Sequence, residues 1–338
     1  MPEAAGSDSD QDRFIGVDVG GTTIKAGIAD AVGRSVVSTE IPTLQHLGPA
    51  DAIQRISAAI RKLIAPSEFG RIRAAGLGTP GPLDVSTGMI LAPANLPAWR
   101  DFPIQRELSQ ALELPVAYAN DANAAAFGEY WAGRGRQFHS LVLLTLGTGV
   151  GSGIIDRDRL IIGSHDHAAE CGHLAVDFAT DARMCSCGVP GHLEAYASAS
   201  SVAARAREGI ADAESGVLAQ TLRSRGEVTA RDVFEAATAG DVAALNIVDE
   251  TADYLARGVA DIAHAVDPQI FLLGGAMDFG GEESTVGSRF RDRIIELARQ
   301  RVFPRIAEHL QVEFASLGGA AGWIGAAGLA QRIYDQGT

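Results

Sequence analysis

The sequence predicts a mixed α/β protein made of two similar halves. Short apolar runs rich in β-branched residues alternate with segments of helical spacing along the chain. Two strand–turn–strand starts with glycine-rich turns occur, one near residue 14 and one near residue 141. With 338 residues, the chain is long enough for about two domains of typical size. We therefore expect two α/β halves, joined near residues 118–135.

Local patterns predict the individual elements. Residues 13–30 form two β-branched runs joined by glycines, which indicates a hairpin, and residues 115–133 predict a strand that passes into an alanine-rich helix. Residues 51–65 have helical spacing with Ile53, Ile56, Ile60 and Ile64 on one face. Strand patterns also cover 71–81 and, in three pieces, 139–163, and 251–275 predicts a helix followed by a buried strand.

Composition excludes several classes of function. No segment approaches the roughly 18 consecutive apolar residues of a membrane span. The 28 Lys and Arg against 42 Asp and Glu give a net charge of −14, which argues against non-specific binding of nucleic acid. Anionic ligands remain open, because backbone N–H groups bind phosphate without basic side chains. We expect no membrane and no nucleic-acid partner.

The cysteines and the N-terminus indicate the compartment. Three cysteines is an odd number, and Cys185 and Cys187 are too close in sequence to bridge each other comfortably. A disulfide framework is therefore not expected, and a reducing cytoplasm is the natural setting. Residues 1–12 are polar and acidic, lack the pattern of a signal peptide, and predict a disordered tail.

Glycine-rich turns occur at the same place in each half. In the first, Asp18 ends a strand, residues 20–22 form the turn, and Lys25 lies on the next strand. The second is "LGTGVGSG", residues 146–153. A lone Asp-x-Gly-Gly is equally compatible with an ordinary hairpin turn, but two matched turns fit a nucleotide clamped between two lobes. The chain has no P-loop motif, and "GLGTPG" (76–81) is not a dinucleotide fingerprint, because Pro80 and Pro82 interrupt the helix start that this fingerprint requires.

Two polar clusters are candidates for chemistry. Asn120 and Asp121 fall where a strand ends and a helix begins, so they are either helix caps or a carboxylate that acts as the base in phosphoryl transfer. Residues 185–192 supply Cys185, Cys187 and His192, and His173 is a candidate fourth ligand. Cysteine and histidine are preferred zinc ligands, and structural zinc needs four of them. The alternative is a loop of small residues without metal.

The chain resembles the ROK-family sugar kinases over residues 13–335. The matching motifs, in order, are "DVGGTTIK", "GLGTPGPLD", "NLPAW", "NDANAAAFGE", "LGTGVGSG", "ECGH", "CSCGVPGHLE" and "LLGGAM". The resemblance implies a two-domain, actin-like ATPase (RNase H-like) fold with ATP and sugar in an interdomain cleft. It implies an N-terminal domain of residues 13–120, joined by a C-terminal helix near 320–335, and a C-terminal domain of 121–319 that carries a zinc loop at 171–194.

The resemblance also implies roles for individual residues. Asp121 would be the catalytic base, and Asp18 would help to order Mg²⁺. The sugar would be held by Gly81, Asn95, Asn120, Asp121, Glu170, His173 and Glu194. ATP would be bound by Asp18, Gly20, Gly21, Thr22, Lys25, Thr148, Gly149, Gly274 and Gly275. Structural Zn²⁺ would be held by His173, Cys185, Cys187 and His192, and would fix the distance between Glu170 and Glu194.

One position departs from the family pattern. The family reads C-x-C-G-x-x-G-C, and here the last cysteine is His192. A Cys₂His₂ site remains chemically sound, because histidine is a good zinc ligand. Two alternatives stay open: a weakened or empty site, and Cys171 as a substitute thiolate, although a small buried residue is the more natural reading of Cys171.

The resemblance implies an ATP-dependent hexokinase that phosphorylates the 6-hydroxyl of a hexose, glucose above all, and that forms a homodimer. Alternatives are a kinase for N-acetylmannosamine or another hexose, polyphosphate in place of ATP, and a non-catalytic sugar-sensing regulator. A repressor of the family carries an N-terminal DNA-binding module, for which thirteen residues are too few. A silent sugar-binding protein is disfavoured because Asp121 and both glycine-rich turns are present.

Overall fold

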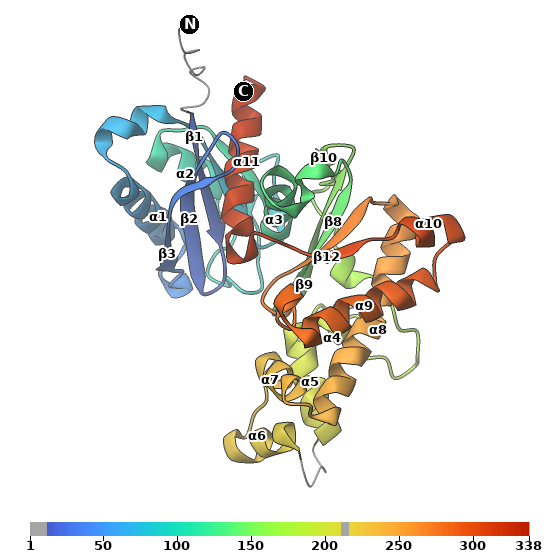
Figure 1. The fold of residues 1–338 in the computed structure, drawn as a ribbon. Helices are drawn as coiled ribbons and strands as arrows, with labels where there is room; N and C mark the ends of the chain where they lie inside the picture. The colour runs from blue at the N-terminus through green and yellow to red at the C-terminus, as the bar shows by residue number, and fades with distance from the viewer. Residues whose placement is uncertain (1–11, 211–215, 338) are drawn as a thin grey trace, which may run out of the picture. The chain divides into compact units, whose positions relative to one another are not determined.

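Two compact α/β units and two five-stranded sheets make up the chain in the computed structural model, which describes residues 12–210 and 216–337 (Figure 1). The first unit contains the described residues up to 137, residues 153–169 and those from 319 onward. The second contains residues 138–152 and the described part of 170–318. The predicted tail, residues 1–12, lies outside the described residues except for Asp12, and the predicted boundary at residue 121 stays a prediction.

The first sheet has the strand order β3-β2-β1-β4-β7, in which β1 pairs antiparallel with β2 and parallel with β4. Its strands are β1 (Arg13–Val19), β2 (Thr23–Asp30), β3 (Ser35–Pro42), β4 (Ile72–Thr79) and β7 (Val116–Asn120), and a small hairpin is formed by β5 (Leu83–Asp84) and β6 (Met89–Ile90). The helices are α1 (Pro49–Leu63), α2 (Ile104–Leu112), α3 (Asp121–Trp131) and α11 (Ala321–Asp335).

The second sheet has the order β10-β9-β8-β11-β12. Its strands are β8 (Leu141–Leu146), β9 (Val150–Asp156), β10 (Arg159–Leu160), β11 (Ile270–Gly274) and β12 (Val312–Phe314). The helices are α4 (Glu194–Ala197), α5 (Ala199–Ile210), α6 (Val217–Arg225), α7 (Ala230–Thr238), α8 (Val242–Val266), α9 (Thr285–Arg299) and α10 (Pro304–His309). Strand by strand in chain order, this sheet repeats the connectivity of the first, so the expectation of two similar halves is confirmed.

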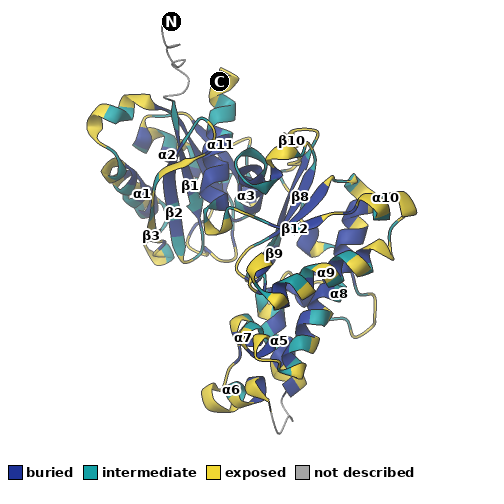
Figure 2. Cartoon of the chain, viewed as in Figure 1, coloured by how far each residue is buried: buried dark blue, intermediate teal, exposed yellow. Residues whose placement is uncertain are grey.

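Alternation along β1 explains how the first sheet is covered on both faces (Figure 2). Ile15 and Val17 are fully buried in one cluster with apolar residues of α1 and α2. The residue between them, Gly16, faces α11, where a Cβ would lie 1.7 Å from the carbonyl oxygen of Trp323. Successive strand residues point to opposite faces. The glycine therefore lets the C-terminal helix pack directly on the sheet.

Most predicted elements are confirmed. The hairpin at 13–30, the β7–α3 junction, the three strands in 139–163 and the α8–β11 pair are all present. The predicted helix at 51–65 runs instead over Pro49–Leu63, with Ile53, Ile56 and Ile60 buried. Ile64 follows in extended conformation, because a separate 3₁₀ helix starts at Pro66 and the ring of Pro66 cannot donate a helical hydrogen bond. Within the described ranges, every helix is too short or too polar to cross a membrane.

Candidate active site and metal centre

The first glycine-rich turn, residues 20–22, joins β1 to β2. The Gly20 amide donates to the Thr23 carbonyl at 3.0 Å and closes the turn. Thr43, fully buried, holds the turn from outside the hairpin: its hydroxyl donates to the Gly20 carbonyl at 2.7 Å and its amide donates to the Thr22 carbonyl at 2.8 Å. The turn is therefore fixed in shape by a residue that the motif does not contain.

Two carboxylates and one amine come together beside this turn. Asp18 lies near the end of β1, and Asp121 begins α3 directly after β7, in the same sheet. Burial above all, and then the Asp121 carboxylate, raise the pKa of Asp18 from 3.8 to about 7, against the opposing effect of the Lys25 ammonium. Lys25 also donates to the Gly319 carbonyl at 2.9 Å. The structure thus shows that these two carboxylates repel each other, as expected for neighbouring like charges.

Asn120 and Asp121 make different contacts at the start of α3. Asn120 is the N-cap, since its Oδ1 accepts from the amides of Ala122 at 2.9 Å and Asn123 at 3.2 Å. Asp121 Oδ1 accepts from the Ala122 amide at 2.8 Å. The Asn120 side chain serves the cap through its oxygen, which leaves its amide nitrogen on the side of Gly81. Asn120 therefore has a structural role as well as any role in binding.

The second glycine-rich turn, residues 147–149, joins β8 to β9. The Gly147 amide donates to the Gly149 carbonyl at 3.0 Å. Gly274 ends β11, and Gly275, with φ of 93°, lies against the end of β8, where a Cβ would be 2.2 Å from the Leu146 carbonyl oxygen. The close approach of the two strand ends thus depends on the absence of a side chain at this position.

A cavity of about 560 Å³ adjoins the second turn. Its lining includes Gly147, Thr148, Ala199, Thr229, Phe234 and Met277. The cavity is large enough for a small organic ligand, and its aromatic and thioether side chains offer flat, apolar contact. Of these residues, the sequence motifs indicated the turn and the segment around Met277, but α7 carries no recognisable binding motif.

Four predicted metal ligands converge in the second unit. One ligand atom from each of His173, Cys185, Cys187 and His192 lies within 4.8 Å of the other three. Nδ1 of His192 is 3.2 Å from Cys187 Sγ and 3.3 Å from Nδ1 of His173, which in turn is 3.8 Å from Cys185 Sγ. Bond lengths of about 2.0–2.3 Å place ligand atoms roughly 3.3–3.8 Å apart around a tetrahedral zinc. The spacing and the donor set therefore fit a closed Cys₂His₂ site.

Electrostatics at this cluster favour the metal-binding form of one imidazole. Burial and the neighbouring His173 lower the pKa of His192, which keeps its ring neutral. Burial raises the pKa of the Cys185 thiol to about 11, so a metal would have to displace its proton. Cys171 is buried outside the cluster, and its amide donates to Ser152 Oγ at 3.0 Å. Cys171 is therefore a core residue, as the favoured interpretation of the sequence predicted.

Glu194 already has protein partners on both carboxylate oxygens. Oε1 accepts from Ser186 Oγ at 2.6 Å, and Oε2 accepts from the Val150 amide at 3.1 Å. A carboxylate has about four lone-pair sites, so Glu194 can still accept from a further donor. Glu170 differs, because its side chain is exposed and its carbonyl accepts from the His173 amide at 3.0 Å.

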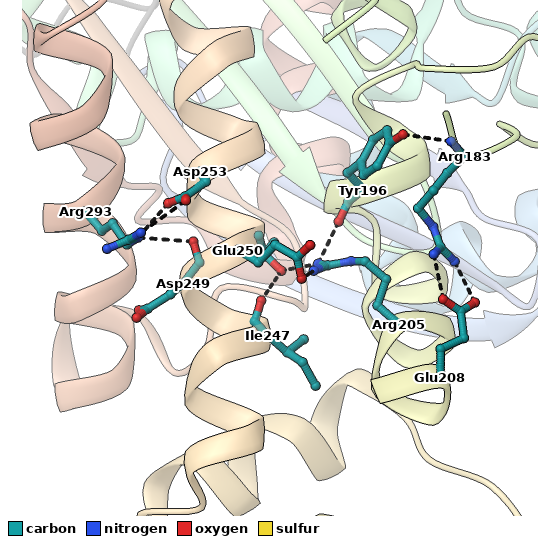
Figure 3. Close-up of polar contacts among 10 residues, drawn as sticks. Arg183, Tyr196, Arg205, Glu208, Ile247, Asp249, Glu250, Asp253 and Arg293 are labelled. Carbon is teal, nitrogen blue, oxygen red and sulfur yellow. Dashed lines mark hydrogen bonds and ion pairs between the residues drawn. The ribbon is translucent and has the colours of Figure 1, made fainter. Parts of the chain in front are cut away.

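A polar network anchors the metal loop, residues 184–192, to neighbouring helices (Figure 3). The Tyr196 hydroxyl accepts from the Arg183 amide at 2.7 Å, and the Arg183 guanidinium forms two bonds to Glu208, at 2.7 and 2.8 Å. Arg205, buried, donates to the Tyr196 carbonyl at 2.9 Å and pairs with Glu250 of α8 at 2.7 Å. Contacts therefore fix the loop from both of its ends.

Comparison with known proteins agrees with this geometry. The sequence profile of the ROK family matches residues 14–333. A glucokinase of Halalkalibacterium halodurans is 37% identical over 94% of this chain and 95% of its own length. The structure of a ROK family glucokinase from Streptomyces griseus in complex with glucose and AMPPNP is 34% identical, with a TM-score of 0.79 over 95% of this chain and 99% of that one.

A ROK hexokinase from Thermus thermophilus is similar to the same degree, with 32% identity and a TM-score of 0.79 over 96% of this chain and 99% of that one. The family profile and these relatives each cover nearly the whole chain, so the resemblance extends well beyond the individual motifs. The architecture is the two-domain, actin-like ATPase fold. The chain belongs to the ROK family.

Proposed function

We propose that this protein is an ATP-dependent glucokinase that transfers the γ-phosphoryl group of ATP to the 6-hydroxyl of glucose. The observation that carries the proposal is the match, along nearly the whole chain, to glucokinases that include one solved with glucose and AMPPNP. The local chemistry supports it: a ligand-sized cavity adjoins one glycine-rich turn, and paired carboxylates lie beside the other.

Asp121 is the proposed general base. In phosphoryl transfer the protein mainly positions the groups and neutralises charge, and one aspartate commonly accepts the proton of the attacking hydroxyl. Asp121 stands at the N-terminus of α3, where the helix dipole stabilises a negative charge. Asp18 is the neighbouring carboxyl group, and its pKa is raised. A bound cation would favour its charged form. Mg²⁺ would supply that cation together with ATP, and Asp18 would help to hold it.

The proposed nucleotide contacts come from residues of both glycine-rich turns. The phosphates would contact Gly20, Gly21, Thr22, Thr148 and Gly149, with Lys25 nearby, and the adenosine would lie toward Gly274 and Gly275. The cavity lined by Phe234 and Met277 supports a nucleobase in that region, because flat apolar side chains favour stacking on an aromatic ring. Polyphosphate, the alternative phosphoryl donor, has no nucleobase that could occupy this cavity.

The proposed sugar contacts come from Gly81, Asn95, Asn120, Glu170, His173 and Glu194. His173 supports this assignment in one detail: its Nδ1 lies within the metal cluster, so Nε2 is the ring nitrogen that remains for a sugar hydroxyl. Zn²⁺ held by His173, Cys185, Cys187 and His192 would act as a structural clip, since all four positions would be protein ligands.

A coupled ADP-release assay over a panel of hexoses tests the proposal. Glucose is expected to give the highest kcat/KM when compared with mannose, allose, N-acetylglucosamine and N-acetylmannosamine. ATP is expected to be preferred over polyphosphate as the donor. A higher kcat/KM for N-acetylmannosamine would reassign the substrate, and no turnover of any hexose would favour a sugar-sensing regulator.

Compartment and assembly are further parts of the proposal. Three free cysteines, two of them in the metal cluster, favour a reducing cytoplasm. A homodimer is expected, and sedimentation analysis at micromolar concentration would report twice the 35.2 kDa mass of the chain.

A further inference from the structure

The residues that follow the metal loop hold the second glycine-rich turn. The Ala199 amide donates to the Gly147 carbonyl at 2.8 Å, and the Ser200 hydroxyl donates to the Thr148 carbonyl at 2.9 Å. Glu194 Oε2 accepts from the amide of Val150, the first residue after the turn, at 3.1 Å. The turn is thus bonded to the start of α4 and the start of α5, and each of these contacts lies within the second unit.

Glu194 connects this turn to the metal loop. Its other oxygen, Oε1, accepts from Ser186 Oγ at 2.6 Å, and Cys185 Sγ is 3.5 Å away. Ser186 lies between the two cysteines of the loop. The carboxylate therefore spans the gap between the loop and β9, with a hydrogen bond at each end.

The Glu194 carboxylate lies close to Gly149 of the turn. A Cβ on Gly149 would lie 2.4 Å from Glu194 Oε2, so any side chain at 149 would displace the carboxylate. Ser201 fixes the backbone of Glu194 as well, because its hydroxyl donates to the Glu194 carbonyl at 2.8 Å. Both the side chain and the backbone of Glu194 are thus constrained.

The turn held in this way is a wall of the cavity. Gly147, Thr148 and Ala199 all line the volume of about 560 Å³ in which the nucleotide is proposed to bind. A shift of the turn therefore changes the cavity directly. An exposed side chain that holds the turn acts on the ligand only through the turn, so it is a positioning residue.

We propose that Glu194 is a strut between the metal loop and the second glycine-rich turn, and that Ser186 and Ser200 are positioning residues that set the affinity for nucleotide. Ser186 acts at the loop end of the strut, and Ser200 acts on the turn itself. The inference rests on the proposed function in taking ATP as the ligand of the cavity. It adds that a change inside the Cys-x-Cys segment alters the affinity for nucleotide.

Two single substitutions and a matched control test this inference. Ser200→Ala and Ser186→Ala each remove one hydroxyl donor from an exposed serine. Ser224→Ala is the control, because Ser224 is also an exposed serine that donates to a backbone carbonyl, that of Thr221 at 3.1 Å, in α6. Zinc content and melting temperature, measured for all three, report whether the fold and the metal loop are retained.

The Kd of a non-hydrolysable ATP analogue, measured by calorimetry without sugar, is the main readout. Ser200→Ala is expected to raise this Kd about 3- to 10-fold, the range for loss of one neutral hydrogen bond, and to leave the Kd of glucose within about 2-fold. The KM for ATP should rise while kcat stays within about 2-fold. Ser186→Ala is expected to raise the Kd of both ligands, and Ser224→Ala to change neither.

The double variant Ser186→Ala, Ser200→Ala tests whether Glu194 connects the metal loop to the turn. If the two serines act through one connected element, their effects on the analogue Kd should not be additive. An analogue Kd for Ser200→Ala equal to that of the control would overturn the inference, as would Ser186→Ala changing glucose affinity alone. Weaker analogue binding by Ser200→Ala in a protein that does not phosphorylate glucose would support this inference and refute the proposed function.

Discussion

The two glycine-rich turns occupy equivalent places in two sheets of the same connectivity, yet they are held differently. The first turn is held by Thr43, a single buried residue that directly follows β3 of the same sheet. The second is held by Glu194, Ala199 and Ser200, which follow the metal loop. The two turns therefore have the same place in the sheet topology but different hydrogen-bond partners. The partners come from later segments of the chain, and these segments differ between the two halves.

Chemistry differs between the two regions in the same way. Beside the first turn lie Asp18 and Asp121, and burial together with the neighbouring Asp121 carboxylate raises the pKa of Asp18. Beside the second lie a cavity and the four residues of the metal cluster. Under the proposed function, the first half carries the general base, and the second half carries the cavity and the metal cluster. Four predictions, in order of decreasing effect, test that division.

Removal of the proposed base should have the largest effect. Asp121→Asn is expected to lower kcat by about 10²–10⁴-fold and to leave the Kd of glucose and of the ATP analogue nearly unchanged, because the carboxylate is needed only when the hydroxyl loses its proton. Asp51→Asn is a matched control, since Asp51 also lies in the first turn of a helix of this unit. Steady-state turnover above about a tenth of the wild-type value would contradict the assignment.

Loss of a metal ligand should act on sugar affinity. Cys185→Ser and Cys187→Ser are expected to lose zinc, to raise the KM for glucose at least about tenfold, and to raise the KM for ATP less, because the metal orders the loop that leads into Glu194. His192→Cys should keep the metal, whereas His192→Ala should lose metal and sugar affinity together. Zinc affinity should also fall as the pH drops, since protons compete for the thiolates.

Elemental analysis of each variant, with one zinc per chain expected in the wild type, checks this prediction. Cys171→Ala is the control, because Cys171 is a buried cysteine outside the cluster. Wild-type protein that contains no zinc would remove the clip altogether. Full zinc and a normal KM in His192→Ala would show that His192 is not a ligand.

Asp18 should make stability depend on pH. The pKa of Asp18 is raised from 3.8 to about 7 in the folded protein, so the folded state binds the proton more tightly than the unfolded state. The resulting stabilisation is fully present below pH 3.8 and is lost as the pH rises through 7. Asp18→Asn should therefore gain about 2–3 kcal/mol relative to wild type between pH 5 and pH 8.

Urea unfolding at both pH values, without added magnesium or nucleotide, measures that difference. The variant and the wild type share all other titrating groups, so subtracting their free energies of unfolding isolates Asp18. Equal pH dependence in the two proteins would show that Asp18 has an ordinary pKa.

The two turns should also differ in what their supporting hydroxyls do. Thr43→Val removes a fully buried donor to the Gly20 carbonyl and is expected to lower the free energy of unfolding by about 1 kcal/mol. Ser200→Ala removes an exposed donor to the Thr148 carbonyl and should leave stability within about 0.5 kcal/mol of wild type. Thermal denaturation of both variants measures the contrast. Equal losses of stability would mean that the two turns are supported alike.

Sequence alone determined the features that depend on near neighbours along the chain. Short apolar runs rich in β-branched residues identified β1, β2 and the β8–β9 pair, and the start of an alanine-rich run located the β7–α3 junction within one residue. The Cys-x-Cys spacing and His192 indicated a metal cluster for the same reason, because three of its four members lie within one loop. The end of α1 was predicted too late, since Ile64 continues the apolar spacing although the chain there is already extended.

Tertiary structure decided the features that join distant segments. Asp18 and Asp121 affect each other because β1, β4 and β7 are neighbours in the sheet, which no local pattern specifies. Thr43 and Ser200 support the turns through contacts that depend on where later segments fold back. Backbone periodicity is a property of successive residues, whereas a hydrogen bond across the fold exists only once packing has fixed the two atoms within about 3 Å of each other.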